Sequence, residues 1–235
     1  MPRACRELCG VSAIHPRMKH LNALFVAAWL VAGSAWSQTP SVAAPGAVAS
    51  AESSAPGGPG MLAPGDVARA LRQGGYVIYF RHTATDFSKN DAASTGYGDC
   101  GNQRLLSKAG QSEAVAIGQR ISTLKLPVTE VMASPMCRTM DTATRLFGRA
   151  TPQPDMREGV AGGIGGGGDY PGLKSLLAAP VAAGGNRWLV GHGSPFRAIA
   201  GAPHLAEGEA AVIRPEGTRW SVVARLLPTD WAVLK

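Results

Sequence analysis

In the stretch VIYFRHTATD, residues 77–86, Arg81 and His82 come immediately after a run of apolar and aromatic residues. Residues 76–80 are apolar at every position and follow two glycines, a pattern that predicts a strand covered on both faces. A strand of that kind lies inside a sheet. Arg81 and His82 are therefore expected at its carboxyl end, where ligands bind in open α/β sheets.

The region after this strand alternates between helical and extended patterns. From Ser107 onward, apolar residues recur at helical spacing until the segment meets Pro127. Residues 130–135 predict a short strand and a turn, and the helix that follows is expected to end at Gly148. The apolar positions of the two helices are Ala114, Ile117, Ile121 and Leu124, then Met136, Met140, Ala143 and Phe147.

A second strand ends in a histidine. Residues 186–195, NRWLVGHGSP, repeat the opening pattern with His192 at the end of the apolar run. Strands that alternate with helices predict an α/β fold, here a doubly wound and mostly parallel sheet with helices on both faces. The chain length leaves no room for a large cap domain, and the two strand-terminal histidines are expected to meet at one site.

The N-terminal segment has the features of an export signal. Arg17 and Lys19 precede the run LNALFVAAWLVAG, whose 13 residues are too short to span a bilayer as a helix. We expect residues 1–37 to be a signal peptide cleaved near Ser37, so that the protein is periplasmic or secreted without a stable membrane anchor. Met18 is an alternative start, and a buried helix or an uncleaved anchor are the other interpretations of this segment.

The remaining chain divides into a linker and a domain. Residues 38–61 are rich in Ala, Pro, Gly and Ser and predict a disordered linker. Residues 62–235 are long enough for one domain with a sizeable core. Residues 159–168 hold seven glycines without periodicity, which indicates a mobile loop rather than a phosphate-cradling motif.

Charge and cysteine content narrow the class of partner. Removal of residues 1–37 lowers the formal charge from +7 to +4, and the rest has no Lys/Arg runs of the kind that bind nucleic acid. A small anionic group is the expected partner. The same removal leaves two cysteines, Cys100 and Cys137. Two cysteines in an oxidising compartment favour one disulfide.

Three motifs in order carry a resemblance to a known family. RHT at 81–83, SPMCRTMDTA at 134–143 and GHG at 191–193 resemble the motifs of the histidine phosphatase superfamily, also called phosphoglycerate mutase-like, in a small exported bacterial form. The segment NQRLLSKAGQSEA before the first long helix is also similar to this family. The resemblance extends from about residue 74 to 196, and we expect it to continue to the end of the chain.

The resemblance implies the roles of the site residues. His82 is expected to be the nucleophile, because a neutral imidazole can attack phosphorus and several cations can balance the charge of the transferred group. The other catalytic residues implied are Arg81, Arg138, His192 and Glu158, and the phosphate-binding residues implied are Arg81, Thr83, Arg138 and His192. No metal or other cofactor is expected, since neither HxxxH nor CxxC spacing occurs. His204 matches no catalytic motif and is interpreted as structural.

The acid that protonates the leaving alcohol has several candidates. Glu158, in DMREG, resembles the family's acidic residue between the arginine helix and the second histidine. Glu207 and Glu209 are rivals, because they follow His192 closely and stand beside apolar residues that raise a carboxyl pKa. Some small members of the family lack this acid, so that none of the three is also an open interpretation.

The resulting hypothesis is an exported phosphomonoesterase that works through a covalent phosphohistidine. A domain without a cap favours a phosphate on a large substrate, such as a cell-envelope glycolipid or a phosphoprotein. The alternative is a non-catalytic phosphate-binding module of the same fold. A 2H phosphoesterase fits less well because His82-Thr83-Ala84 does not match His-x-[Ser/Thr]. The sequence does not decide between phosphatase and mutase.

The implied fold also predicts the cysteine pairing. Cys137 directly precedes Arg138, and Cys100 lies in the loop that leaves His82 over the same edge of the sheet. We therefore expect a disulfide between Cys100 and Cys137 at the rim of the pocket. Two buried thiols and a nucleophilic Cys137 are the alternatives.

Overall fold

A six-stranded mixed sheet forms the centre of the domain. The computed structural model describes residues 60–157 and 168–235. Its strands are β1 (Val77–Arg81), β2 (Glu130–Ala133), β3 (Thr151–Pro152), β4 (Arg187–Gly191), β5 (Ala210–Pro215) and β6 (Trp220–Leu226), in the order β3-β2-β4-β1-β5-β6. The first four strands are mutually parallel, and β5 and β6 add an antiparallel hairpin at the side of β1. The predicted α/β class is confirmed.

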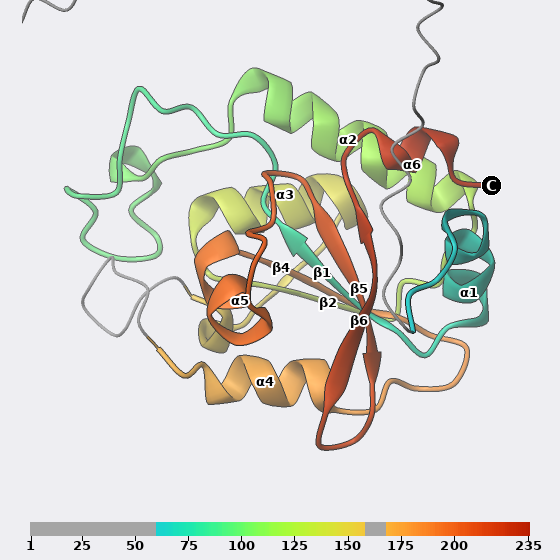
Figure 1. Cartoon of the computed structure of the whole chain (residues 1–235). Coiled ribbons are helices and arrows are strands. Elements are labelled where there is room, and N and C mark those ends of the chain that lie inside the picture. The colour runs from blue at the N-terminus through green and yellow to red at the C-terminus, as the bar shows by residue number, and fades with distance from the viewer. Residues whose placement is uncertain (1–59, 158–167) are drawn as a thin grey trace, which may run out of the picture. The chain divides into compact units, whose positions relative to one another are not determined.

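Helices cover both faces of this sheet. They are α1 (Val67–Gln73), α2 (Lys108–Thr123), α3 (Cys137–Phe147), α4 (Pro171–Ala178), α5 (Gly193–Ala200) and α6 (Asp230–Val233), with short 3-10 helices at Pro64–Asp66, Cys100–Asn102 and Pro154–Met156. Figure 1 shows α2 and α3 on one side of the strands and α4 on the other. The prediction of helices on both faces and no separate cap domain is confirmed in the described residues.

The sheet contributes to two apolar cores because β1 is buried on both faces. Ile78 and Phe80 pack with α1, α2, α3 and α6, whereas Val77 and Tyr79 pack with α4 and α5. All four side chains are fully buried. Successive side chains of a strand point to opposite faces, so a strand that is apolar throughout belongs at the centre of a two-sided sheet.

The start of α2 and the end of α3 lie where the sequence predicts, whereas Met136, expected in the second helix, is its extended N-cap residue. Ser107 caps α2, and its hydroxyl accepts a hydrogen bond from the Gly110 amide at 3.0 Å. Gly148 ends α3 in the left-handed conformation, with φ of 72°. Helix α3 follows β2 after a short turn, so its N-terminus lies at the carboxyl edge of the sheet.

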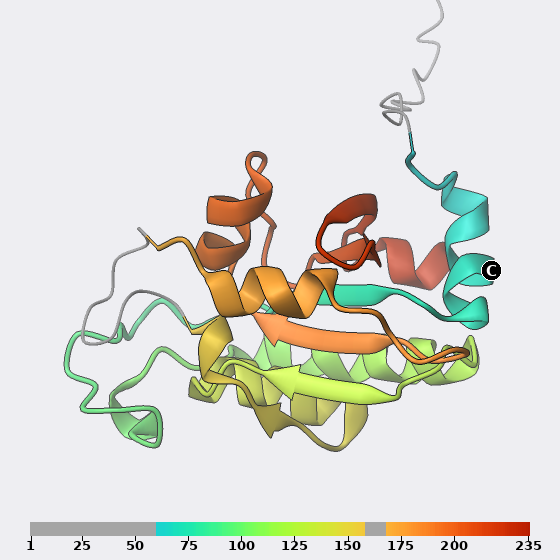
Figure 2. The same ribbon diagram turned by 90° about the horizontal axis from the view of Figure 1, so that it is seen from below.

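The carboxyl edge of the parallel strands is the side where the long connection from β1 to α2 extends. Figure 2 shows the arrowheads of β2 and β4 pointing toward this connection. Within this connection, Thr85 and Leu106 pair in an isolated antiparallel β-bridge.

Some predictions lie outside the described residues. These are the signal peptide, the linker except for Gly60 and Met61, the glycine-rich loop except for Gly168, and Glu158. Within the described part, no helix is both long and apolar enough to cross a membrane.

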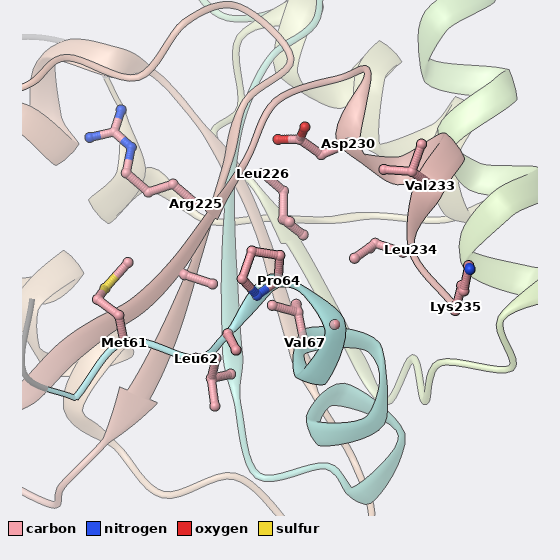
Figure 3. A pocket seen from close by; sticks show the side chains of 13 residues that line it. Met61, Leu62, Pro64, Val67, Arg225, Leu226, Asp230, Val233, Leu234 and Lys235 are labelled. Carbon is pink, nitrogen blue, oxygen red and sulfur yellow. The ribbon is translucent and has the colours of Figure 1, made fainter. Parts of the chain in front are cut away.

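A groove lies away from the predicted site residues. It is lined by the segment that precedes α1, by β6 and by α6, and Figure 3 shows Leu62, Leu226 and Val233 among its side chains. None of the residues predicted for the site lines it.

Candidate active site

The topology of the sheet brings the two strand-terminal histidines together. β1 and β4 are neighbouring parallel strands in which Arg81 stands opposite Gly191. The His82 amide donates to the Gly191 carbonyl at 3.0 Å, and the ring centroids of His82 and His192 are 5.6 Å apart. Both side chains are almost completely buried. The structure therefore places the two histidines in one site, as expected for the ends of adjacent parallel strands.

His82 is a neutral imidazole with a defined tautomer. Its Nδ1 lies 3.0 Å from the Thr83 carbonyl oxygen, which can only accept, so Nδ1 carries the proton and the lone pair is on Nε2. Burial lowers the pKa of His82 to about 3; the bond to Thr83 opposes this shift, and the charges of Arg138, Arg81 and Arg104 add to it. At neutral pH the ring is therefore an uncharged potential nucleophile.

His192 is held from both sides by neighbouring strands. Its Nε2 lies 2.8 Å from the Ser134 hydroxyl, which follows β2. The Tyr79 hydroxyl accepts from the His192 amide at 3.0 Å and donates to its carbonyl at 2.8 Å. Burial, followed by the charge of Arg138, lowers the pKa of His192 well below its usual value. A fixed neutral ring thus stands beside His82.

Arg138 stands in the first turn of α3, where the free amides of the helix also favour an anion. Its side chain is 1% exposed, and Nη1 lies 3.2 and 3.0 Å from the two carboxylate oxygens of Asp91. Thr142 links this helix to the segment after β1, because its hydroxyl donates to the Arg138 carbonyl at 2.8 Å and accepts from the Thr83 amide at 3.3 Å. The predicted role of Thr83 in phosphate binding stays a prediction.

The side chain of Arg81 extends from the end of β1 toward the turn that precedes β5. Its Nη1 donates to the Leu205 carbonyl at 2.7 Å and lies 3.3 Å from Nδ1 of His204. Its Nη2 lies 3.6 Å from Glu207 Oε1. His204, interpreted from the sequence as structural, therefore contacts a residue of the site.

The three candidate acids have different positions. Glu158 lies outside the described residues. Glu207 Oε1 lies 4.0 Å from His82 Nδ1. Glu209 binds Arg225 Nε and the Ala206 amide, both at 2.6 Å, which ties its turn to β6 rather than to the site.

Three residues of the β1–α2 connection that the sequence analysis did not predict also contact or electrostatically affect residues of the candidate site. Asp91 binds Arg138, as described. Gln103 is fully buried, and its Oε1 accepts from the Cys137 amide at 2.9 Å. The charge of Arg104 lowers the pKa of both histidines. Gln103 and Arg104 belong to the NQRLL segment that resembles the family, which is the signal that could have identified them, whereas Asp91 has no such signal.

The same connection brings the two cysteines together. Cys100 and Cys137 have their sulfur atoms at bonding distance and their Cα atoms 5.7 Å apart. This spacing suits a disulfide. The pair links the connection to the start of α3, one residue before Arg138. That the bridge forms in the native protein stays a prediction.

The site has the features needed for phosphoryl chemistry. Burial and then the positive charges of Arg81, Arg104 and Arg138 lower the pKa of His82 and His192, so both rings are neutral. The lone pair of His82 is on Nε2. Arginine forks suit phosphate oxygens, and a neutral imidazole suits in-line attack on phosphorus. The fold and side chains define an α/β domain with a candidate anion site around a histidine.

Comparison with solved structures gives matches to several phosphatases. The protein histidine phosphatase SixA, solved with tungstate, is 16% identical with a TM-score of 0.49, and the match covers 66% of this chain and 98% of SixA. A phosphoserine phosphatase mutant of Entamoeba histolytica, solved with phosphoserine, is 12% identical with a TM-score of 0.45, covering 66% of this chain and 98% of that one. A mycobacterial glucosyl-3-phosphoglycerate phosphatase with inorganic phosphate is 16% identical with a TM-score of 0.44, covering 64% and 96%.

Comparisons at the level of sequence found no match. No protein-family profile and no curated protein sequence matches this chain. At these identities and TM-scores, the solved structures by themselves define neither the activity nor the substrate of this chain.

Proposed function

We propose that this domain is a histidine phosphatase that transfers a phosphoryl group from its substrate to Nε2 of His82 and then to water. The observation that carries the proposal is the state of His82. Burial keeps the ring uncharged, with a pKa of about 3, and the Thr83 carbonyl holds the Nδ1 proton at 3.0 Å. No group of the described residues hydrogen-bonds Nε2, so its lone pair is available to phosphorus.

The chemical steps balance without another reactant. In the first step the Nε2 lone pair forms the N–P bond, and the P–O bond breaks with its electrons on the leaving oxygen, which takes a proton from an acid or from water. In the second step water attacks phosphorus, releases a proton, and the N–P electrons return to Nε2. Arg81, Arg104 and Arg138 supply positive charge to the phosphoryl oxygens in both steps.

A phosphate-binding module is the second candidate function. It would need the arginines but would have no use for a nucleophile, and the free lone pair of His82 favours the enzyme. Turnover of an aryl phosphate separates the two functions, because a binding module would bind the intact ester without releasing its alcohol.

We further propose that the protein acts outside the cytoplasm on a large phosphorylated substrate. Export is supported by the signal-like residues 1–37. Between α3 and β4, the described residues form only β3, one short 3-10 helix and α4, so the described part contains no cap that would enclose a small sugar. A phosphate on a cell-envelope glycolipid or a phosphoprotein fits such a domain, and a screen of both against free sugar phosphates tests the preference.

Rapid-quench labelling tests the central proposal. The purified protein is mixed with substrate that carries a labelled phosphate, and we expect a burst of phosphoenzyme that is stable to base and labile to acid. His82→Ala should abolish both the label and the turnover, and His192→Ala should slow turnover about 10²- to 10⁴-fold. Turnover by the wild type without a labelled species would reject nucleophilic catalysis by His82.

A further inference from the structure

We propose that Glu207 is a positioning residue for the nucleophile, whose carboxylate supports the Nδ1 side of His82 and stabilises the positive charge that the ring acquires when Nε2 bonds to phosphorus. This inference rests on the phosphoryl transfer proposed above. It removes Glu207 from the candidates for the general acid and gives it a different task.

The backbone fixes Glu207 beside the end of β1. The Gly208 amide donates to the His82 carbonyl at 2.9 Å, and the Arg81 amide donates to the Glu209 carbonyl at 3.0 Å. These two bonds extend the antiparallel pairing of β5 with β1 past the last strand residue. The position of Glu207 is therefore set by the sheet and not by a free loop.

The side chain of Glu207 is held in one orientation by donors. Its Oε2 accepts from the Thr85 amide at 3.2 Å, and its Oε1 accepts from the Thr85 hydroxyl at 2.7 Å. Oε1 also lies 3.6 Å from Arg81 Nη2, and the side chain is only 18% exposed. Two hydrogen bonds and an adjacent guanidinium therefore fix the orientation of this carboxyl group.

The geometry places this carboxylate on the side of the ring away from the reaction. Oε1 lies 4.0 Å from Nδ1, the nitrogen whose proton is bound by Thr83. In an in-line displacement the leaving oxygen stands beyond phosphorus, as seen from Nε2. Glu207 is therefore on the opposite side of the imidazole from the leaving oxygen and cannot deliver a proton to it.

The charge of the ring changes during the reaction, and Glu207 acts on that change. The resting imidazole is neutral, because burial keeps its pKa at about 3. Formation of the N–P bond turns it into a cationic phosphoimidazolium that retains the Nδ1 proton. An interaction that is stronger in the charged state than in the resting state lowers the barrier to phosphoryl transfer. A carboxylate at 4.0 Å in a mostly buried site meets this condition.

The charged or titratable groups around Glu207 are Arg81, His82 and Glu113 of α2. Burial, and then the charge of Glu207, raise the pKa of Glu113. This coupling identifies Glu113 as the neighbouring acid in which the carboxylate form is disfavoured, while Arg81 and the two Thr85 donors face Glu207.

The variant Glu207→Gln tests the inference in the full chain. Glutamine keeps the side-chain volume and an oxygen acceptor for Thr85 but removes the charge. We expect the rate of phosphoenzyme formation to fall about 10²-fold with KM changed less than about twofold. The loss should be equal for aryl and alkyl phosphates. The matched control is Glu216→Gln, which removes the same charge from an exposed residue next to the β5–β6 turn and should leave the rate unchanged.

A second variant keeps the test decisive if Glu207→Gln does not fold, as judged by thermal melting. Thr85→Val removes the hydroxyl that binds Oε1 and leaves the carboxylate in place. We expect it to slow phosphoenzyme formation about fivefold, because the carboxylate loses part of its orientation.

The outcomes distinguish this inference from the proposed function. Wild-type phosphorylation rates in folded Glu207→Gln, or in Thr85→Val where the glutamine variant does not fold, would overturn the role of Glu207. A loss that is much larger for alkyl than for aryl phosphates would also overturn it, because that pattern belongs to a general acid. Absence of any phosphohistidine in the wild type would refute the proposed function itself.

Discussion

The ion pair between Arg138 and Asp91 allows catalysis and stability to be separated by mutation. Arg138 is 1% exposed and Asp91 is 11% exposed, and Nη1 reaches both carboxylate oxygens. Asp91 also accepts from the Arg104 amide at 2.8 Å. Arg138→Ala therefore removes one cation from the proposed phosphate site and also leaves a mostly buried carboxylate without its guanidinium.

The two consequences have different magnitudes. Removing one member of a buried ion pair costs about 3–5 kcal/mol. Because Asp91 retains the Arg104 amide and some exposure, we expect the lower end, about 3 kcal/mol, which corresponds to roughly 6–12 °C in Tm for a domain of this size. Loss of the charge that faces the phosphoryl group should lower kcat/KM about 10²- to 10⁴-fold.

A double-mutant cycle measures both effects. Asp91→Ala should lower stability and reduce kcat/KM only about tenfold, far less than Arg138→Ala, because the guanidinium remains. The variant that combines both changes should recover part of the stability lost by Arg138→Ala and none of the activity. Thermal melting and aryl phosphate turnover are the measurements. An Arg138→Ala protein that melts lower but keeps wild-type kcat/KM would show that Arg138 is structural, and the reasoning about the anion site would fail.

Three further predictions concern other parts of the site. Glu158→Gln should slow alkyl phosphates far more than aryl phosphates if it is the general acid, since a good leaving group needs no proton, and equal losses would remove it from that role. A native disulfide between Cys100 and Cys137 should contribute roughly 4 kcal/mol in the chain-entropy model, so reduction should lower Tm, and uptake of two alkyl groups without reductant would disprove the bridge. Because His82 has a folded pKa of about 3 against 6.5 in the unfolded chain, the unfolded state binds more protons between these values. Stability should therefore fall as pH drops from 6.5 toward 3, and His82→Ala should show a shallower fall in pH-dependent melting.

Local patterns in the sequence were sufficient for the elements that carry the main site residues. Residues 76–80 predict a strand because apolar side chains at every position need cover on two faces, and Ser107 and Gly148 mark helix ends by their own hydrogen bonding and backbone freedom. Parallel strands end at a common edge, so the positions of His82 and His192 after such strands predicted that they would meet.

The tertiary structure decided which polar residues join them. Glu207 and Glu209 are two positions apart and equally acidic in the sequence, yet the turn before β5 directs one toward His82 and the other toward Arg225. Asp91 reaches Arg138 across 47 positions of the chain from a segment without periodicity. Periodicity and capping report only on neighbours within a few residues. Partners brought together by the folding of a long connection leave no such local pattern, and for this reason only the assembled structure identifies them.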